Sequence, residues 1–344
     1  MLKKKIDDIL KKNGLIIKKI NSDLKLEDYF SKKINFYPYT HSLFRLKFNL
    51  EQILNKNNKY FDFSGIIIYE NKEIGYWPFT YLKEQNKVSS YGFNIFQPIF
   101  INNLSIGLKK KIIKNILNSI YEVCSVLKIK RFCTEDTFIN ENLNSISLWH
   151  EINLQFTKNR DVNYDLYVDI KKNYSSIKSN YRKSYKSLIN QSQNLFEIKI
   201  LKKDDYQMYM NFKSLHEHVS GRQTRSNISW DLNFKEIENG NSILIYLMKK
   251  NHLLGGSIFN LTSHEAIYGV GVYDRKYFDI PLSHSIQDKA IQIFQKKNIS
   301  WYKLGDWYQP LKKNINDKKL EDISNFKKGF ATNIINRFIF NHII

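Results

Sequence analysis

Apolar and polar residues follow the same pattern in two stretches of the chain, one in each half. Residues 61–80 read FDFSGIIIYENKEIGYWPFT, and residues 242–261 read SILIYLMKKNHLLGGSIFNL. In each stretch a short polar turn separates two apolar runs, which predicts a pair of antiparallel strands. Gly75 stands early in the second run of the first stretch, and Gly255 and Gly256 stand at the matching place in the other. The sequence therefore predicts two β-hairpins with the same arrangement of strands, turn and glycines.

The same order of elements follows each hairpin. After the first come YGFNIFQPIF, a helical pattern at about 105–127 and the strand pattern IKRFCTE; after the second come IYGVGVY, Pro281, a helical pattern at about 283–297 and ISWYKLGD. The order recurs at an offset of about 180 residues. Because antiparallel hairpins are mixed with a helix between strands, we predict an α/β (α+β) protein with two tandem domains. Each has a mixed central sheet flanked by helices, and we place them at 1–160 and 161–344.

The chain has 344 residues, enough for two domains, and a formal net charge of +21. That charge favours a nucleic acid, a phosphorylated small molecule or an anionic membrane surface as partner. Abundant lysine, asparagine and isoleucine are also what an AT-rich coding bias produces. The arginines are a stronger indication of an anionic ligand, because only eight of the 54 basic residues are Arg. A guanidinium group binds phosphate through two hydrogen bonds at once. We expect Arg182, Arg222, Arg225 and Arg275 to bind substrate phosphate; ordinary surface arginines are the alternative.

Membrane and redox signals are weak throughout the sequence. The N-terminal stretch MLKKKIDDILKKNG is charged and amphipathic, and no later run approaches the roughly 20 apolar residues of a membrane span. We therefore expect a cytoplasmic protein without a transmembrane segment. Cys124 and Cys133 have neither metal-type nor redox-type spacing, so we interpret both as reduced and structural.

Two basic stretches are candidates for binding an anion. Residues 173–192 have apolar residues at helical spacing beside Lys178, Arg182 and Lys186, and contain no acidic residue. This ridge predicts an anionic partner, and a solvated helix face is the alternative. Residues 215–230 read LHEHVSGRQTRSNISW. The two histidines lack a third metal ligand, so we predict no metal site, and the glycine suits a turn that presents arginines to an anion.

The strand YGVGVY carries Gly269 and Gly271 in alternation with apolar residues, as expected where one face stays bare for a ligand. Ser283 and His284 follow at the start of a helix, where backbone N–H groups attract anions; Ser283 as the N-cap is the alternative. We assign donor binding to these four residues. Walker, GxGxxG and nucleophile-elbow patterns are all missing, so nothing indicates nucleotide hydrolysis, a dehydrogenase or a serine hydrolase.

The segment YKLGDW ends a strand with a tight Gly305–Asp306 turn. After about twenty mostly polar residues, ISNFKKGF places Phe326 and Lys327 ahead of Gly329. We interpret this excursion as a flap that covers a site and returns as a strand. The alternative is a surface loop followed by an edge strand guarded by lysines.

Together these pieces, from about residue 166 to residue 330, are similar to the Fem-type peptidyltransferases, tandem-domain members of the GNAT acyltransferase superfamily. The similarity rests on the basic helix, LHEHVSGRQTR, LLGGSIF, YGVGVYD, the helix after Pro281, YKLGDW and FKKGF, with a fainter echo in the first half. The resemblance implies two GNAT-like domains, the second carrying the active site, and transfer of an acyl group to an amine. Fem-type enzymes take the acyl group from an aminoacyl-tRNA and place it on an amino group of a cell-wall precursor.

The resemblance also implies roles for individual residues. Lys327 would face the reacting carbonyl, Tyr273 would lie beside the reaction centre, and Arg222 or Arg225 would hold a precursor's diphosphate. No tightly bound cofactor is implied, since the donor, aminoacyl-tRNA or acyl-CoA, arrives as a co-substrate. For the amine's proton we consider Asp306 or His216 as acceptor, because histidine has a suitable pKa.

The sequence departs from acetyl-CoA enzymes of this superfamily at one place. Their pyrophosphate loop, of the type Arg/Gln-x-x-Gly-x-Gly/Ala, is replaced by DRKYFDIPLSH, which has no glycine. Fem-type enzymes lack the loop too, which favours aminoacyl-tRNA or an unusual CoA mode. The expected partner is a phosphorylated glycan or peptide precursor, with tRNA and peripheral membrane contact as further candidates. Two other functions stay open: a CoA-dependent N-acetyltransferase of a nucleotide amino sugar, and a non-catalytic GNAT-like module that binds tRNA or a phosphorylated glycan precursor.

Overall fold

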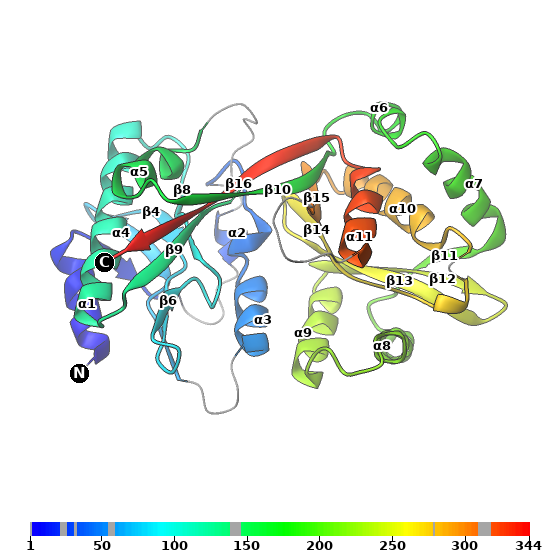
Figure 1. Cartoon of the computed structure of the whole chain (residues 1–344), viewed down its shortest axis with the longest axis horizontal. Coiled ribbons are helices and arrows are strands. Elements are labelled where there is room, and N and C mark those ends of the chain that lie inside the picture. The colour runs from blue at the N-terminus through cyan, green and yellow to red at the C-terminus, as the bar shows by residue number, and fades with distance from the viewer. Residues whose placement is uncertain are drawn as a thin grey trace. The chain divides into compact units, whose positions relative to one another are not determined.

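The computed structural model describes residues 2–20, 26–30, 33–53, 59–137, 146–277, 279–308 and 318–344. The chain divides into two compact units (Figure 1). Unit 1 comprises Met1–Asn163 and Asn336–Ile344, and unit 2 comprises Tyr164–Ile335. Both units combine sheets with helices, so the α/β class is confirmed. In the part of the chain so described, no helix is both long and apolar enough to cross a membrane.

Unit 1 contains two small sheets of strand order β1-β3-β4-β8 and β2-β5-β6, together with neighbouring strands β16, β9 and β7. Its helices are α1 (Leu2–Lys12), α2 (Leu26–Phe30), α3 (Leu43–Ile53), α4 (Ile106–Val126) and α5 (Leu148–Phe156). Its strands are β1 (Ile16–Lys18), β2 (Tyr60–Asp62), β3 (Gly65–Tyr69), β4 (Lys72–Trp77), β5 (Thr80–Leu82), β6 (Lys87–Ser89), β7 (Ile95–Phe96), β8 (Ile99–Phe100), β9 (Arg131–Asp136) and most of β16 (Asn333–Ile343).

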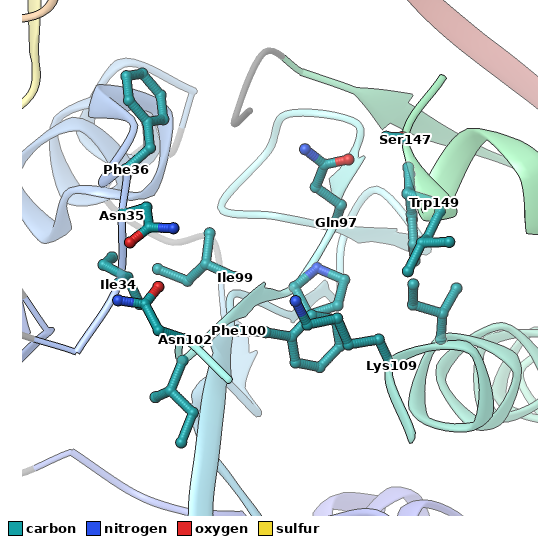
Figure 2. Close-up of a pocket in the computed structure, with 14 residues that line it drawn as sticks. Ile34, Asn35, Phe36, Gln97, Ile99, Phe100, Asn102, Lys109, Ser147 and Trp149 are labelled. Carbon is teal, nitrogen blue, oxygen red and sulfur yellow. The ribbon is translucent and has the colours of Figure 1, made fainter. Parts of the chain in front are cut away.

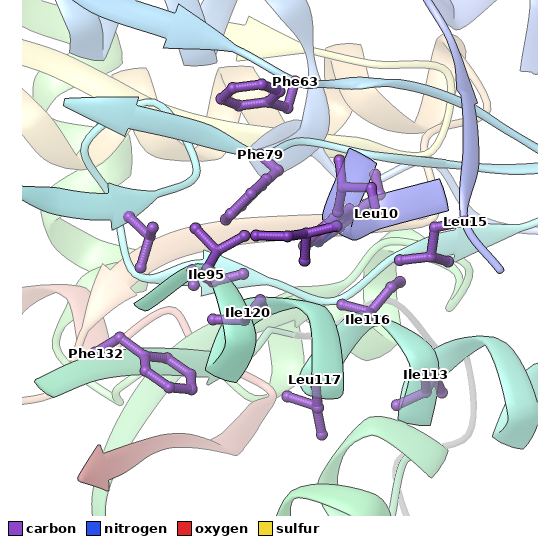
Figure 3. Close-up of a cluster of buried hydrophobic side chains, with 14 of the residues drawn as sticks. Leu10, Leu15, Phe63, Phe79, Ile95, Ile113, Ile116, Leu117, Ile120 and Phe132 are labelled. Atoms are coloured by element: carbon purple, nitrogen blue, oxygen red, sulfur yellow. The ribbon is translucent and has the colours of Figure 1, made fainter. Parts of the chain in front are cut away.

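The core of unit 1 forms around α4 (Figure 3). Ser105 caps this helix, since its side chain accepts a hydrogen bond from the backbone N–H of Leu108. Ile116 and Ile120, four residues apart and both fully buried, lie on one face of the helix and pack in the cluster that contains Leu10 of α1. Each such buried side chain contributes about 1.5–3 kcal/mol. The apolar spacing of this segment therefore explains both the helix and its position.

Unit 2 has one sheet with the strand order β11-β12-β13-β14-β15-β10. Its strands are β10 (Arg160–Asp169, which starts in unit 1), β11 (Glu197–Ile200), β12 (Ser242–Lys249), β13 (His252–Leu261), β14 (Glu265–Tyr273) and β15 (Trp301–Asp306). Its helices are α6 (Tyr174–Ser179), α7 (Tyr185–Leu195), α8 (Tyr206–Ser220), α9 (Asn227–Glu238), α10 (Leu282–Lys296) and α11 (Lys318–Lys328).

Helices cover both faces of this sheet (Figure 1). One face packs against α6, α7 and α10 through a cluster that includes Ile177, Ile189 and Ile286. The other packs against α8 and α9 through a cluster that includes Phe212 and Trp230. We call these the α10 face and the α8 face.

Most predicted elements are confirmed. The hairpins are β3–β4 and β12–β13, and the helices that follow are α4 and α10. The single helix predicted at 173–192 is wrong, because α6 ends at Ser179 and α7 begins at Tyr185. Between them, the backbone N–H of Arg182 donates to the carbonyl of Gly329 instead of to its own helix.

The strand predicted at FKKGF is also wrong. Phe326 and Lys327 lie in α11, and the rings of Phe326 and Phe330, four residues apart, both pack on Tyr185. A spacing of four places side chains on one face in a helix and in a strand alike, but the backbone N–H of Gly329 donates to the carbonyl of Asn325, which is the hydrogen bond of a helix. Residues 309–317, about half of the predicted flap, lie outside the described residues, and the residues that follow form α11.

Candidate active site

Strands β14 and β15 pair over a short distance only. Their parallel register covers Glu265↔Trp301, Ala266↔Tyr302 and Ile267↔Lys303. Beyond this point β14 continues to Tyr273 and β15 to Asp306 without further pairing between these two described strands. The register between β13 and β14 shifts at the same place, which leaves Gly269 as a bulge. Separated strand ends leave backbone N–H and C=O groups that an extended substrate can pair with.

Lys327 lies where the two strands separate. Its Nζ is 5.4 Å from the ring centroid of Tyr268 on β14. A Cβ on Gly305 of β15 would lie 2.7 Å from the same Nζ. Burial lowers the pKa of Lys327 below its ordinary value, while the charge of Asp306 opposes this and that of Lys303 adds to it. A partly desolvated ammonium in this position can stabilise negative charge that develops on a carbonyl oxygen.

Two tyrosines and a serine lie beside the lysine. The Tyr273 hydroxyl and Ser257 Oγ are 2.8 Å apart, and the Tyr268 hydroxyl hydrogen-bonds with both. Burial raises the pKa of Tyr268 and of Tyr273, so both hydroxyls stay protonated at neutral pH. The group therefore supplies neutral hydrogen-bond donors next to one cation.

Gly269 and Gly271 of β14 leave room for neighbouring side chains of the protein itself. The Tyr268 hydroxyl fills the space that a Cβ on Gly271 would take, and the Asn260 amide lies 2.6 Å from where a Cβ on Gly269 would be. Side chains of this chain thus occupy the space beside both glycines, although both glycines remain exposed to solvent. The alternation of glycines is explained without a ligand, and donor binding by Gly269 and Gly271 stays a prediction.

Asp306 is exposed at the end of β15, where it lies opposite Asp165 of β10. Asp165 is 1% exposed and accepts a hydrogen bond of 2.6 Å from the Lys303 ammonium. This buried ion pair holds Lys303 two strand positions from Gly305. Of the two predicted proton acceptors, the structure brings Asp306 close enough to Lys327 to influence its pKa.

His284 lies at the start of α10 in contact with aromatic rings. Its ring is edge-on to the rings of Tyr185 and Phe326, with distances between ring centroids of 4.6 Å and 5.1 Å. Burial and the nearby Arg182 lower the pKa of His284 to about 4. The N-cap of α10 is Pro281, so the alternative role of Ser283 as N-cap is wrong, and Ser283 lies in the first turn.

Arg182 is bonded within the protein. Its Nη2 donates to the carbonyl of Asn325 in α11 over 2.9 Å, and its guanidinium lies over the Tyr185 ring at 5.2 Å. The arginine thus binds the carbonyl end of α11, where a cation is favoured by the helix dipole. We infer that it positions the helix that carries Lys327.

The remaining predicted residues are not brought to Lys327. His216 is 8% exposed on α8, and its Nε2 lies 3.2 Å from Nη1 of Arg225, whose guanidinium packs over Trp230. These residues belong to the α8 face, opposite Tyr268 and Lys327, so His216 cannot serve the same reaction centre. Burial and Arg225 lower the pKa of His216 to about 4. Arg222 and Arg275 are exposed.

The sequence analysis did not predict several residues of this site. Tyr268, Ser257 and Lys303 are absent from the predicted set, although a tyrosine at each end of YGVGVY and a lysine inside an apolar strand are visible signals. Gln287 of α10 is also missed; its Oε1 accepts from the Tyr302 hydroxyl over 2.5 Å. No group of three His, Cys, Asp or Glu side chains suited to a metal ion occurs among the described residues.

Unit 1 contains a cavity of about 230 Å³ (Figure 2). None of the residues predicted from the sequence line it. Its wall is formed by residues near Ile34, by the segment from Gln97 to Asn102, and by the starts of α4 and α5.

No protein-family model matches the sequence, and no curated protein matches it. Several solved structures match the fold of this chain. The crystal structure of FemX is 12% identical with a TM-score of 0.64, over 95% of this chain and 98% of that one. A conserved protein of unknown function from Bacteroides thetaiotaomicron is 10% identical with a TM-score of 0.57, over 96% and 100%. L-PGS from Bacillus licheniformis is 12% identical with a TM-score of 0.52, over 94% and 93%. The chain therefore has the fold of FemX along nearly its whole length, and the predicted resemblance is confirmed for the fold.

Proposed function

We propose that the chain is an N-acyltransferase. It moves an acyl or aminoacyl group onto an amino group of a bacterial cell-envelope or surface-glycan precursor, an amino sugar or a peptide. The observation that carries this proposal is the position of the Lys327 ammonium, at the separation of β14 and β15 and beside hydroxyl donors. The fold shared with FemX and L-PGS supports an acyltransferase class.

The proposed reaction needs few groups. The amine nitrogen attacks the donor's carbonyl carbon, a C–N bond forms, and the C–O bond of an aminoacyl ester or the C–S bond of a thioester breaks. Lys327 stabilises the oxyanion, with Tyr273 as a second donor. Asp306 accepts the proton that the amine loses and passes it to the leaving oxygen or sulfur, so that the tRNA leaves as an alcohol or CoA as a thiol. Loss of one oxyanion donor typically lowers the rate by a factor of about 10²–10³.

The donor is proposed to be aminoacyl-tRNA or acyl-CoA, bound as a co-substrate. Helix α10 begins after Pro281, and the segment DRKYFDIPLSH that leads into it contains no glycine of the pyrophosphate-loop type. This feature favours a donor that is not held at the start of α10 in the manner of acetyl-CoA. The exposed Arg222 and Arg275 are the proposed phosphate ligands, since Arg182 and Arg225 already contact the protein.

The test is a comparison of donors on the purified chain. Acetyl-CoA is supplied in one reaction and charged total tRNA in another, each with nucleotide amino sugars and lipid-free wall precursors, and products are identified by mass spectrometry. An N-acylated product in either reaction supports the proposal and names the donor class. Binding of tRNA or precursor without any product from either donor would instead support the non-catalytic binding module.

A further inference from the structure

Strand β11 forms one edge of the unit 2 sheet (Figure 1). It pairs with β12 in an antiparallel register that runs from Glu197↔Met248 to Ile200↔Ile245. In the part of the chain that the structure describes, no second strand pairs with it. An open sheet edge presents backbone N–H and C=O groups to any extended segment that approaches it. This edge is therefore a candidate surface for pairing with another chain.

The hydrogen bonds to β12 determine which backbone groups of β11 face outward. The N–H of Leu201 donates to the carbonyl of Leu244, one position beyond the last residue pair of the two strands. Hydrogen-bonded positions alternate along an antiparallel pair, so every second residue counted back from Leu201 bonds to β12. Ile198 and Ile200 lie at the intervening positions. Their N–H and C=O groups therefore point away from β12, toward the open edge.

The charges of β11 are complementary to a second copy of the same strand. Its sequence is EIKI, so Glu197 and Lys199 are two positions apart and share one face. In an antiparallel pair of two β11 strands centred on Ile198, Glu197 of each copy lies opposite Lys199 of the other. The outward groups of Ile198 then bond to those of its copy, and the charged positions become the non-hydrogen-bonded pairs, whose side chains are closest. Opposite charges placed in this way stabilise strand pairing.

The single chain already neutralises the charge of this edge. Lys199 Nζ lies 2.8 Å from Glu197 Oε2, and the two side chains are 48% and 65% exposed. A lone lysine protects a sheet edge from pairing, because the approaching strand has no counter-charge for it. Here the acid and the base occur in the order that a reversed copy of the strand matches. The edge is therefore protected against most other strands but not against its own copy.

Exposed apolar side chains flank the strand. Leu195, Ile200 and Tyr206 are 43%, 45% and 46% exposed. Leu195 is the last residue of α7, directly before the strand, and Tyr206 is the first residue of α8. Pairing about Ile198 brings Leu195 of one copy close to the end of the other copy's β11, where Ile200 lies. Specific interfaces bury about 1,200–2,000 Å², so a four-residue strand needs such flanking surface as well.

We propose that the chain forms a two-fold symmetric dimer in which the β11 strands of two copies pair antiparallel about Ile198. Two ion pairs between Glu197 and Lys199 cross the interface, and the two unit 2 sheets become one continuous sheet. A two-fold contact of this kind is closed, because each copy uses the same open edge and leaves none for a third. The proposal concerns assembly and depends on no step of the acyl transfer assigned to unit 2.

The first test is sedimentation equilibrium of the purified chain at about 10–100 μM, a range that detects micromolar dimers. We expect the mass of two chains. Lys199→Glu places two acids opposite each other at both pairs and should raise the Kd for dimerisation about tenfold. The double exchange Glu197→Lys with Lys199→Glu reverses both pairs and should restore the dimer. Lys114→Glu makes the same charge change at an exposed residue of α4 in unit 1 and should leave the Kd unchanged.

The second test is amide hydrogen exchange of the unmodified chain at low and high concentration. The amides of Ile198 and Ile200 should exchange more slowly in the dimer, because only there do they donate across the edge. This measurement decides the question without a variant, should any variant fail to fold by circular dichroism.

A chain that stays monomeric throughout this concentration range would overturn the proposal. So would a dimer whose Kd is the same for Lys199→Glu and Lys114→Glu, or whose formation leaves exchange at Ile198 and Ile200 unchanged, since another surface would then hold it together. Failure of the double exchange to restore the dimer would contradict the assigned register. Turnover is not measured in either test, so the outcome is independent of the proposed acyl transfer.

Discussion

The Lys327 ammonium occupies the space that a side chain on Gly305 would need, since a Cβ there would lie 2.7 Å from Nζ. The two residues come from α11 and β15. Gly305 also has a φ of +127°, a backbone conformation that favours glycine. The position of the lysine therefore depends on the absence of a side chain on the strand beneath it.

Gly305→Ala should damage both stability and transfer. The positive φ predicts a loss of about 1–3 kcal/mol in the free energy of unfolding, and the added methyl displaces Lys327. Denaturant unfolding and turnover assays measure the two effects. Gly107→Ala is the control, because nothing lies within 4 Å of its Cβ position in α4, so it should be neutral or stabilising. Full turnover by a folded Gly305→Ala chain would show that the position of Lys327 does not matter.

Lys327→Ala should lower kcat/KM for acyl transfer by a factor of about 10²–10³, because one oxyanion donor is lost. Lys328→Ala is the matched control: that lysine is the next residue, is exposed, and lies over the Trp307 ring at 4.3 Å. Its removal should change turnover little. Steady-state kinetics and circular dichroism on both variants separate a catalytic loss from unfolding, and equal losses would remove Lys327 from its assigned role.

The pH dependence of transfer should report on Lys327. Its protonated form is the active one, so kcat/KM should fall as pH rises through the pKa of Lys327, which burial lowers below 10.5. The Asp306 charge raises that pKa. Asp306→Asn should therefore move the alkaline limb of the profile to lower pH, in addition to any loss of rate. Asp322→Asn, an exposed acid of the same helix as Lys327, should leave the limb in place.

His284→Phe should stabilise the chain more at acid pH than at neutral pH. The pKa of His284 is about 4 in the folded chain, against about 6.5 in an unfolded one. The unfolded chain therefore binds the proton first as pH falls, and the folded state loses stability between these two values.

A phenylalanine among the same aromatic rings removes this loss. The gain from His284→Phe should be larger at pH 5 than at pH 7.5 by about 1–2 kcal/mol. Denaturant unfolding at both values measures it, with the exposed His218→Phe as control. A gain that does not change with pH would contradict the assigned pKa.

The sequence predicts the local elements well because their signals are short-range. The β12–β13 hairpin follows from two apolar runs around a polar turn, and α10 from apolar residues at helical spacing. Lys327 and Gly305 are both singled out by the segments that carry them. Their contact is not predictable, since it depends on where α11 packs.

The errors have physical causes of longer range. FKKGF is too short to distinguish helix from strand, and Phe326 packs on Tyr185, a residue far away in the sequence. His216 is separated from Lys327 because α8 packs on the opposite face of the sheet, which the sequence does not encode locally. The cavity of unit 1 is not predictable either, because its wall is built from segments that are far apart in the sequence.

The central claim is transfer of an acyl group to an amine with the help of Lys327. The most direct test is mass spectrometry of the acceptor after incubation with donor and either the unmodified chain, Lys327→Ala or Lys328→Ala. We predict an N-acylated acceptor from the unmodified chain and from Lys328→Ala, and about a hundredfold less from Lys327→Ala. An acceptor that gains no acyl group from any donor, or that gains equal amounts from all three chains, would contradict the account.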